Sequence, residues 1–595
     1  MLHTHAKVTF GILLTAACGW HRDAAAQFVP DLPETPYNYS QITLPQHFSV
    51  NAFPANLPQN AVTDNDNTPA DNPITDAGAT LGRVLFYERK LSANETVACA
   101  TCHQQEFAFT DPLALSVGFE GGTTRRRSMS LINARFYESG KFFWDERADT
   151  LEDQVLEPIQ DHVEMGLTLE ELVTVVESQD YYPDLFTDAF GDSEVTTDRI
   201  SRALAQFVRS IVSYRSKYDE GRAQVNSPLA PFPNFTQEEN AGKNLFMRPV
   251  PNTQASCVTC HMSEAFITPA RFNAPPNVIS DATNNGLDPV STIDFGVLEA
   301  TGNQADDFKF KVPSLRNVAV RPPYMHDGRF TSLQQVIGFY SGGIRNHPNL
   351  HPILRGPNGQ PVRFNFNAQQ RDAMVAFLET LTDEDVMSED MYSDPFVFVP
   401  PPPLVEGFLI NAGDPQRSLV TEVSVFFDQE VTAEDSAFSI LDRETGDSVE
   451  GLIVQREVLE GKTVVHLTFS EDAHVILRDN GAHSLIDGNY QLDIRAVDVT
   501  AIDSGPAMER DVSFGTIEDD QFFCLFGDSD GDRDVDGVNY GHFSQTFFRS
   551  APDPNYNEIF DYDGDDDVDG QDFGNFLARW MMTMPFSSGS LSFGL

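Results

Sequence analysis

Basic residues are scarce in this 595-residue chain, in which 39 Lys and Arg face 89 Asp and Glu, for a formal net charge of −50. Nucleic acids and anionic membranes bind cationic surfaces, so this balance argues against both as partners. The excess of acidic over basic residues is unevenly distributed, because residues 401–595 hold 39 acidic and 10 basic residues, a net charge of −29. Hydrophobic residues make up 41% of the chain, which suffices for packed cores and excludes wholesale disorder.

Long apolar runs are also missing. The apolar stretch Val8–Ala17 is too short to span a bilayer, and a small-residue region ending at Ala26 follows it. This pattern, after a weakly basic start, indicates a secretory signal peptide over residues 1–26. Lipid attachment at Cys18 is the less favoured alternative, because the expected Leu three residues earlier is missing. We therefore expect an exported protein of the periplasm or cell envelope, without a transmembrane segment.

Cysteine is rare, with six residues, and its spacing is not that of a disulfide framework. Four cysteines form two copies of a Cys-x-x-Cys-His motif, made by Cys99, Cys102, His103 and by Cys257, Cys260, His261. Two thiols at this spacing can bond the two vinyl groups of one haem, and the adjacent His can then ligate the iron. A redox dithiol or half a zinc site would leave the following His unexplained twice. The sequence therefore predicts two covalently bound c-type haems.

The chain changes character along its length. Residues 27–75 are rich in Pro, Asn and Asp and predict an extended, irregular lead-in. A helical pattern follows to about residue 390, with capping boxes expected at Thr168, Thr236 and Thr331. The apolar residues between Ile200 and Ile211 recur every three or four positions, as on one buried helix face.

A proline-rich linker over residues 394–404 separates this region from a different pattern. Apolar residues alternate over 423–427, and a second β-rich run covers 464–469. Runs of this kind predict an all-β sandwich of roughly immunoglobulin size over residues 405–517. It contains no convincing catalytic constellation, so a spacer or adhesion module is the favoured interpretation.

Further motifs flank the two haem motifs in a fixed order. They are Leu-Gly-Arg-Val-Leu-Phe at 81–86, Phe-Trp-Asp-Glu-Arg-Ala at 143–148, Leu-Glu-Asp-Gln at 151–154, Val-Glu-Met-Gly at 163–166, Lys-Val-Pro-Ser-Leu-Arg-Asn at 311–317, Pro-Tyr-Met-His-Asp-Gly at 323–328 and Phe-Tyr-Ser-Gly-Gly at 339–343. With these motifs, residues 80–385 resemble the bacterial dihaem cytochrome c peroxidase family, which includes MauG. The resemblance implies two cytochrome c-like domains, a peroxidatic one over residues 76–230 and an electron-transfer one over residues 231–393.

The resemblance also implies roles for three side chains around the first haem. Glu164 would be the acid–base group beside peroxide, Gln154 would help to form the same pocket, and Trp144 would lie between the haems on the electron route. A carboxylate near bound peroxide can take a proton from one oxygen and deliver it to the other, so that water leaves.

Three positions depart from the family pattern. Phe119 stands where many members have a His that blocks the first iron, and Phe cannot ligate iron, so we expect an open first haem at rest. Tyr340 aligns with the Met ligand of the second haem, as in MauG-like members, with Met325 and Met374 as alternatives. The Asn that offers an oxygen atom to an interhaem calcium in the family is replaced near Arg127, which puts that calcium in doubt, since a guanidinium could occupy the place of the cation.

Residues 518–585 contain two copies of an acidic loop, which start 33 residues apart. The loops of this acidic repeat offer oxygen ligands at positions 1, 3, 5, 9 and 12, as a calcium-wrapping loop does, namely Asp528, Asp530, Asp532, Asp536 and Asn539 in the first and Asp561, Asp563, Asp565, Asp569 and Asp572 in the second. Aromatic helices are expected over 540–548 and 573–580. The pattern resembles a dockerin-type pair of half EF-hands, and it implies bound calcium and, less certainly, a cohesin-like or surface partner.

The predicted fold is therefore multidomain: a mainly α region of two cytochrome c-like haem domains, an immunoglobulin-like β-sandwich and a small α calcium-loop domain. The predicted function is reduction of hydrogen peroxide to water with electrons from a small cytochrome c or similar donor. The alternatives are a MauG-like oxidase acting on a protein or small organic substrate, and a non-enzymatic dihaem electron-transfer protein.

Overall fold

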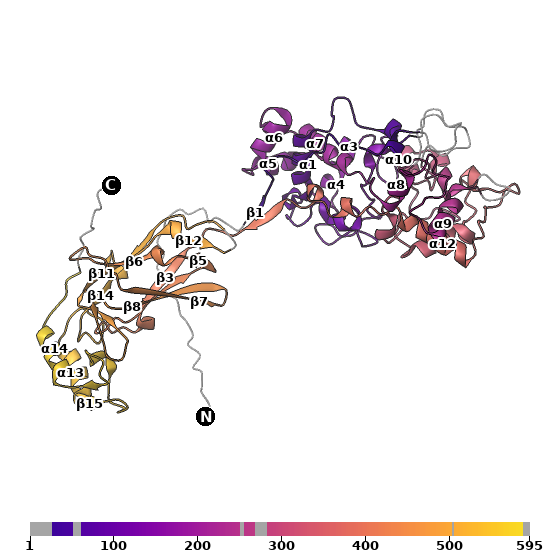
Figure 1. Ribbon diagram of the computed structural model, residues 1–595. Helices are drawn as coiled ribbons and strands as arrows, with labels where there is room; N and C mark the ends of the chain where they lie inside the picture. The colour runs from indigo at the N-terminus through magenta and orange to yellow at the C-terminus, as the bar shows by residue number, and fades with distance from the viewer. Residues whose placement is uncertain are drawn as a thin grey trace. The chain divides into compact units, whose positions relative to one another are not determined.

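The computed structural model describes residues 27–50, 61–137, 139–249, 255–267, 282–502 and 505–586. The chain divides into two compact units, one of residues 29–397 and one formed mainly by residues 398–595 (Figure 1). The predicted signal peptide, residues 1–26, lies outside the described residues. Within the described residues, no helix has the length and apolar character needed to cross a bilayer.

The first unit is mainly helical, with long connections. Its α-helices are α1 (Asp76–Tyr87), α2 (Cys99–Cys102), α3 (Leu151–Gln154), α4 (Glu157–Gln160), α5 (Leu169–Glu177), α6 (Tyr182–Phe190), α7 (Thr197–Ser210), α8 (Lys217–Arg222), α9 (Gln237–Met247), α10 (Leu298–Thr301), α11 (Leu333–Gly338) and α12 (Ala368–Glu379). The predicted apolar face over residues 200–211 is confirmed, because its side chains are buried along α7.

Two helix pairs form the framework of this unit, α1 with α7 and α9 with α12. A glycine lies at the crossing of each pair. A Cβ atom on Gly82 would lie 2.0 Å from the carbonyl oxygen of Ala203, and one on Gly242 would lie 1.8 Å from that of Ala373. Only a residue without a side chain permits such close approaches, so a glycine allows the two helices to cross closely in each half.

The predicted capping boxes at Thr168 and Thr236 are confirmed at the starts of α5 and α9. The third prediction was one residue early. Ser332 caps α11 by accepting a hydrogen bond from the backbone N–H of Gln335, whereas the backbone N–H of Thr331 donates to the Gln335 side chain. Ser332 takes the role because its extended backbone directs its hydroxyl to the first turn.

The second unit is β-rich, which confirms the predicted change of structure after the proline run. The strands of the chain are β1 (Gln27–Pro30), β2 (Phe396–Val399), β3 (Val405–Ile410), β4 (Val423–Phe427), β5 (Val431–Ala433), β6 (Phe438–Asp442), β7 (Leu452–Leu459), β8 (Lys462–Phe469), β9 (Val475–Ile476), β10 (Ser484–Leu485), β11 (Gly488–Ile494), β12 (Val499–Ala501), β13 (Val512–Phe514), β14 (Phe522–Cys524), β15 (Arg549–Ser550) and β16 (Asp567–Val568).

Two antiparallel four-stranded sheets enclose one apolar core. One sheet has the order β3-β4-β8-β7, and in the other β11 pairs with β6, β13 and β14. The register pairs Val423 with Leu467 and Val425 with Val465, and all four side chains are buried. The period of two in the sequence therefore marks the face of β4 that packs inward.

The acidic repeat packs onto these strands. Its helices are α13 (Gly537–Thr546) and α14 (Gly570–Arg579), each of which begins three residues earlier than predicted. The reason is that Asp536 and Asp569 act as helix caps through their side chains. The Ser418 hydroxyl accepts from the backbone N–H of Gly527 (2.8 Å) and donates to the carbonyl oxygen of Ile559 (2.6 Å).

Candidate functional site

The first Cys-x-x-Cys-His motif opens onto a cavity of about 700 Å³. Cys99 and Cys102 are free thiols at the ends of α2, and burial raises their pKa values to about 12 and about 11. His103 directs Nδ1 at the carbonyl oxygen of Phe109, 3.0 Å away. A carbonyl accepts only, so Nδ1 carries the proton and Nε2 keeps its lone pair for a metal. Burial also lowers the pKa of His103, which favours the neutral ligand form.

The second motif repeats this arrangement in a separate cavity of about 210 Å³. Cys257 and Cys260 are free thiols, and the Nδ1 atom of His261 lies 3.2 Å from the carbonyl oxygen of Phe266. Burial lowers the pKa of His261 to about 4. Each motif thus presents two thiols and one neutral imidazole, the set that a c-type haem requires. The Ser128 hydroxyl lies 3.4 Å from Nε2 of His103.

Two guanidinium groups line the second cavity without a carboxylate partner among the described residues, those of Arg127 and Arg321. Both donate to backbone carbonyls, and the buried Nε atom of Arg321 has no hydrogen-bond partner. Burial lowers both pKa values to about 10. Unpaired buried cations are costly, and the two propionates of a haem would supply the missing negative charge. The side chains that line the second cavity therefore fit a haem.

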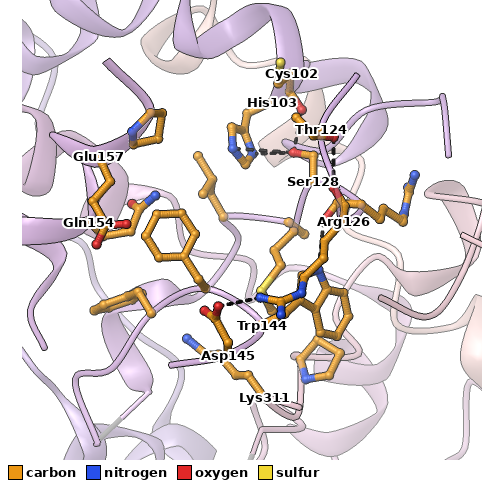
Figure 2. Close-up of a pocket in the computed structure, with 18 of the residues that line it drawn as sticks. Cys102, His103, Thr124, Arg126, Ser128, Trp144, Asp145, Gln154, Glu157 and Lys311 are labelled. Atoms are coloured by element: carbon orange, nitrogen blue, oxygen red, sulfur yellow. Dashed lines mark hydrogen bonds and ion pairs between the residues drawn. The ribbon is translucent and has the colours of Figure 1, made fainter. Parts of the chain in front are cut away.

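Glu164 lines the first cavity together with Gln154, Glu157 and His103. Burial is the main cause that raises the pKa of Glu164 to about 7, and the neighbouring Asp161 adds to the rise. This carboxyl group can therefore both accept and donate a proton near neutral pH. Figure 2 shows Gln154 and Glu157 side by side on one flank of the cavity, across from His103.

Phe119 does not line the first cavity, although Ser116 from the same segment does. The Phe119 ring packs against Gly166, where a Cβ atom would meet it at 2.6 Å. Gly118 beside it is equally tight against the carbonyl oxygen of Val163. This contact holds the segment that follows Ser116 against the backbone on either side of Glu164.

Trp144 lies in the wall that the two cavities share. Its indole Nε1 donates to the carbonyl oxygen of Arg127 (2.8 Å). The Arg127 guanidinium donates to the carbonyl oxygens of Leu113 (2.7 Å) and Arg321 (3.0 Å), which belong to different halves of the unit. A cationic side chain therefore occupies a ring of carbonyl oxygens beside this tryptophan.

Comparisons with known proteins match this arrangement. The family model for di-haem cytochrome c peroxidase matches residues 76–226. The chain is 34% identical to methylamine utilization protein MauG of Paracoccus denitrificans over 363 residues, 52% of this chain and 90% of that protein. It is 31% identical to cytochrome c551 peroxidase of Nitrosomonas europaea over 309 residues, 51% of this chain and 80% of that protein. The chain belongs to the dihaem cytochrome c peroxidase and MauG family.

Among solved structures, a MauG-like protein associated with microbial copper homeostasis is 30% identical, with a TM-score of 0.48 over 58% of this chain and 99% of that one. The family relationship covers the helical unit. The resemblance inferred from the short motifs is thereby confirmed, and two c-type haems follow from the family.

Three candidate ligands for the second iron of this family member line the second cavity, namely Tyr340, Met325 and Met374. Tyr340 lies in a π-helical turn, Phe339–Gly343, that continues α11. Such turns are rare and frequent at functional sites. The Tyr340 hydroxyl accepts from the side-chain amide of Asn285 (3.2 Å), and burial raises its pKa.

Sequence reasoning missed several charged side chains of the cavities, among them Lys311, Arg126 and Arg321. Arg126 binds Asp145 (2.5 Å) and Asp294 (2.7 Å) at the edge of the first cavity. Lys311 is the first residue of the motif at 311–317 and Arg321 follows that motif, and this position was the available signal. Their pairing with residues far away in the sequence was not predictable from one chain.

The acidic loops bring together part of each predicted ligand set. Asp528, Asp530 and Asp532 form one cluster, and Asp561, Asp563 and Asp572 form another, with oxygen atoms within 4.8 Å of one another. Asp536 and Asp569 cap helices, the Asn539 amide donates to Asp530 (2.9 Å), and Asp565 accepts from a backbone N–H. Burial raises the pKa of Asp528 and of Asp572 to about 6.

Proposed function

We propose that this protein is an exported dihaem peroxidase, which reduces hydrogen peroxide to two waters with two electrons from a small cytochrome c or similar donor. The observation that carries the proposal is Glu164, a carboxyl group with a pKa of about 7 beside the first motif's cavity. Cleavage of the signal peptide after Ala26 and an envelope location are part of the proposal, since c-type haem is attached outside the cytoplasm.

The haem groups, when bound, supply an iron that binds peroxide at the first site and a carrier of electrons at the second. His103 and His261 would hold the two irons from one face, each fixed by its carbonyl partner. Glu164 would take the proton from the near oxygen of peroxide and give it to the far oxygen, so that water departs. Gln154 would orient the peroxide by hydrogen bonding.

The space around the first motif supports peroxide access. The cavity there has about 700 Å³ against about 210 Å³ at the second motif, although both would hold the same group. Phe119 offers no ligand and packs on Gly166 outside the cavity lining. The described lining of the first cavity would therefore leave room for peroxide at the first haem, and Trp144 in the shared wall would connect the two haems.

The proposal is tested by mixing hydrogen peroxide with the haem-loaded protein in a stopped-flow spectrometer. Glu164→Gln should slow the peroxide reaction by about 10²–10⁴-fold, the usual contribution of a positioned acid–base group. Glu157→Gln is the matched control, because Glu157 lines the same cavity but is paired with Arg147 (2.7 Å). A Glu164→Gln rate equal to that of the native protein would remove Glu164 from the mechanism.

A MauG-like oxidase is the second candidate function, favoured by Tyr340 in the second cavity. A phenolate oxygen on the second iron stabilises the ferric state, and it would lower the reduction potential relative to Met. Tyr340→Met should therefore raise the potential of one haem, and an unchanged potential would point to Met325 or Met374 instead. Turnover with reduced cytochrome c distinguishes the peroxidase from an oxidase of organic or protein substrates, and an electron carrier would show neither activity.

The acidic repeat is proposed to bind calcium through its two loops, next to an immunoglobulin-like module that acts as a spacer or attachment domain. Carboxylates whose pKa values are raised by burial should be stabilised by a divalent cation. Calcium at 100 times its Kd would add about 2.7 kcal/mol to the stability of this unit. Asp528→Asn and Asp561→Asn should abolish the effect.

The control for this calcium effect is Asp534→Asn at position 7 of the first loop, where the backbone carbonyl and not the side chain binds the ion. Pull-down of a cohesin-like or surface protein only in the presence of calcium would support an anchoring role. The Arg127 guanidinium among carbonyl oxygens argues against a further calcium between the haems.

A further inference from the structure

Tyr137 is a buried tyrosine in the wall of the first cavity, and it is hydrogen-bonded to a carboxylate. Its hydroxyl donates to Oε1 of Glu146 at 2.5 Å, and only 4% of the residue is exposed. Glu146 is half-buried and follows Trp144 and Asp145 in the chain. The phenolic proton therefore has an acceptor within transfer distance, and that acceptor reaches toward solvent.

Lys311 covers the same tyrosine. Its ammonium nitrogen lies 3.6 Å from the centre of the Tyr137 ring and donates to the carbonyl oxygen of Lys141 (3.0 Å). Figure 2 shows Lys311 beside Asp145 and Trp144, at the end of the cavity away from Cys102. Burial lowers the pKa of Lys311 to about 7, so near neutrality a large share of the side chain is uncharged and does not oppose removal of an electron from the ring.

We propose that Tyr137 is a redox-active residue that gives one electron to the first haem site during peroxide reduction, while its proton passes to Glu146. The inference rests on the proposed peroxidase function, which supplies the oxidant. It goes beyond that function by giving the first cavity its own electron source and a route for oxidising equivalents toward the surface.

The step balances in charge and mass. Reduction of one peroxide consumes two electrons and two protons, and Tyr137 supplies one of the electrons to the oxidised site. The O–H bond of the phenol breaks, the proton bonds to the Glu146 carboxylate, and a neutral tyrosyl radical remains. A one-electron donor such as reduced cytochrome c or a phenol later returns the electron, and the proton goes back from Glu146 to the phenolic oxygen.

Position singles out this tyrosine among similar ones. Tyr181 also donates to a carboxylate, that of Glu88, and Tyr218 donates to Glu264 (2.6 Å). Neither of these two tyrosines lines the first cavity. A hydrogen-bonded carboxylate thus occurs at several tyrosines, whereas its combination with the wall of the peroxide cavity occurs at Tyr137 within the described residues.

The experiment is freeze-quench electron paramagnetic resonance after one equivalent of hydrogen peroxide is added to the haem-loaded full chain. The native protein should give an organic radical whose hyperfine splitting collapses when it is grown with β-deuterated tyrosine. Tyr137→Phe should lose at least nine-tenths of this signal, and Glu146→Gln should reduce its yield several-fold because the proton acceptor is weaker. Tyr181→Phe, which removes a similar tyrosine–carboxylate pair elsewhere, should leave the signal unchanged.

The optical spectrum of the haems separates this inference from the peroxidase function. The optical change of the haems on peroxide addition reports peroxide reduction without reference to any tyrosine. If that change is normal in the native protein but the radical is absent, insensitive to deuterated tyrosine or unchanged in Tyr137→Phe, the inference fails and the peroxidase function stands. Failure of peroxide to alter the haem spectrum would overturn both.

Discussion

In both halves of the helical unit, the motif histidine donates from Nδ1 to a phenylalanine carbonyl, and a glycine lets two helices cross closely. The linings of the two cavities differ much more. Glu164 and Gln154 line the first cavity and not the second, whereas Arg321 lines the second, which is otherwise largely apolar. Arg127 and Lys311 line both cavities. One duplicated framework thus presents the same set of two thiols and one histidine twice, and in the proposed function the remaining wall residues would decide which half reacts and which conducts electrons.

The largest effect that would test this comparison comes from removing each histidine in turn. His103→Ala should abolish the peroxide reaction, a loss of more than about 10³-fold, because the iron loses its ligand at the reactive site. His261→Ala should leave the first peroxide reaction in place and abolish turnover with reduced cytochrome c. Stopped-flow and steady-state assays measure the two. Equal loss of the peroxide reaction in both variants would contradict the assignment of separate roles.

The pH dependence of the peroxide reaction distinguishes the halves next. In the proposed mechanism Glu164 acts first as a base, so its carboxylate form would be the active one, and the pKa of about 7 means that this form is lost as pH falls below 7. The rate should rise about tenfold per unit below pH 7 and level off above it. In Glu164→Gln this inflection should vanish. A native profile that is flat between pH 5 and pH 8 would exclude the role.

The shared framework is tested by matched substitutions at the two helix crossings. Gly82→Ala and Gly242→Ala each force a methyl group onto a backbone carbonyl, so each should cost about 1–3 kcal/mol of stability. Gly338→Ala, at a glycine with open space around it, is the control. Thermal unfolding of the three variants gives the comparison, and a loss at only one crossing would show that the halves are held together differently.

The smallest expected effect concerns the unpaired cations of the second cavity. Arg321→Met removes a buried positive charge beside the second haem, and positive charge favours the reduced, less positive iron. The reduction potential of that haem should fall, while the potential of the first haem stays unchanged. A spectroelectrochemical titration resolves the two haems. A shift in the reduction potential of the first haem alone would contradict the placement of Arg321 beside the second haem.

Local patterns made several of these features predictable. The two Cys-x-x-Cys-His motifs, the buried face of α7 and the alternation along β4 depend on residues that are neighbours in sequence. Lys311 over Tyr137 joins positions that are 174 residues apart, and no period or spacing connects them. The helix starts at Gly537 and Gly570 were missed for a different reason, because loop aspartates serve at the same time as helix caps.

The strand β14 belongs to two parts of the chain at once. Its residues Phe522 and Cys524 pair with β11 in the sheet, and the chain then enters the first acidic loop at Asp528. A fragment that takes β14 with the acidic repeat would remove a strand from the sheet, and it would expose the sulfur of Cys524, which is buried in the whole chain. Whoever wishes to transplant the acidic repeat as a fusion tag should therefore carry the preceding strands with it, from residue 405 onward.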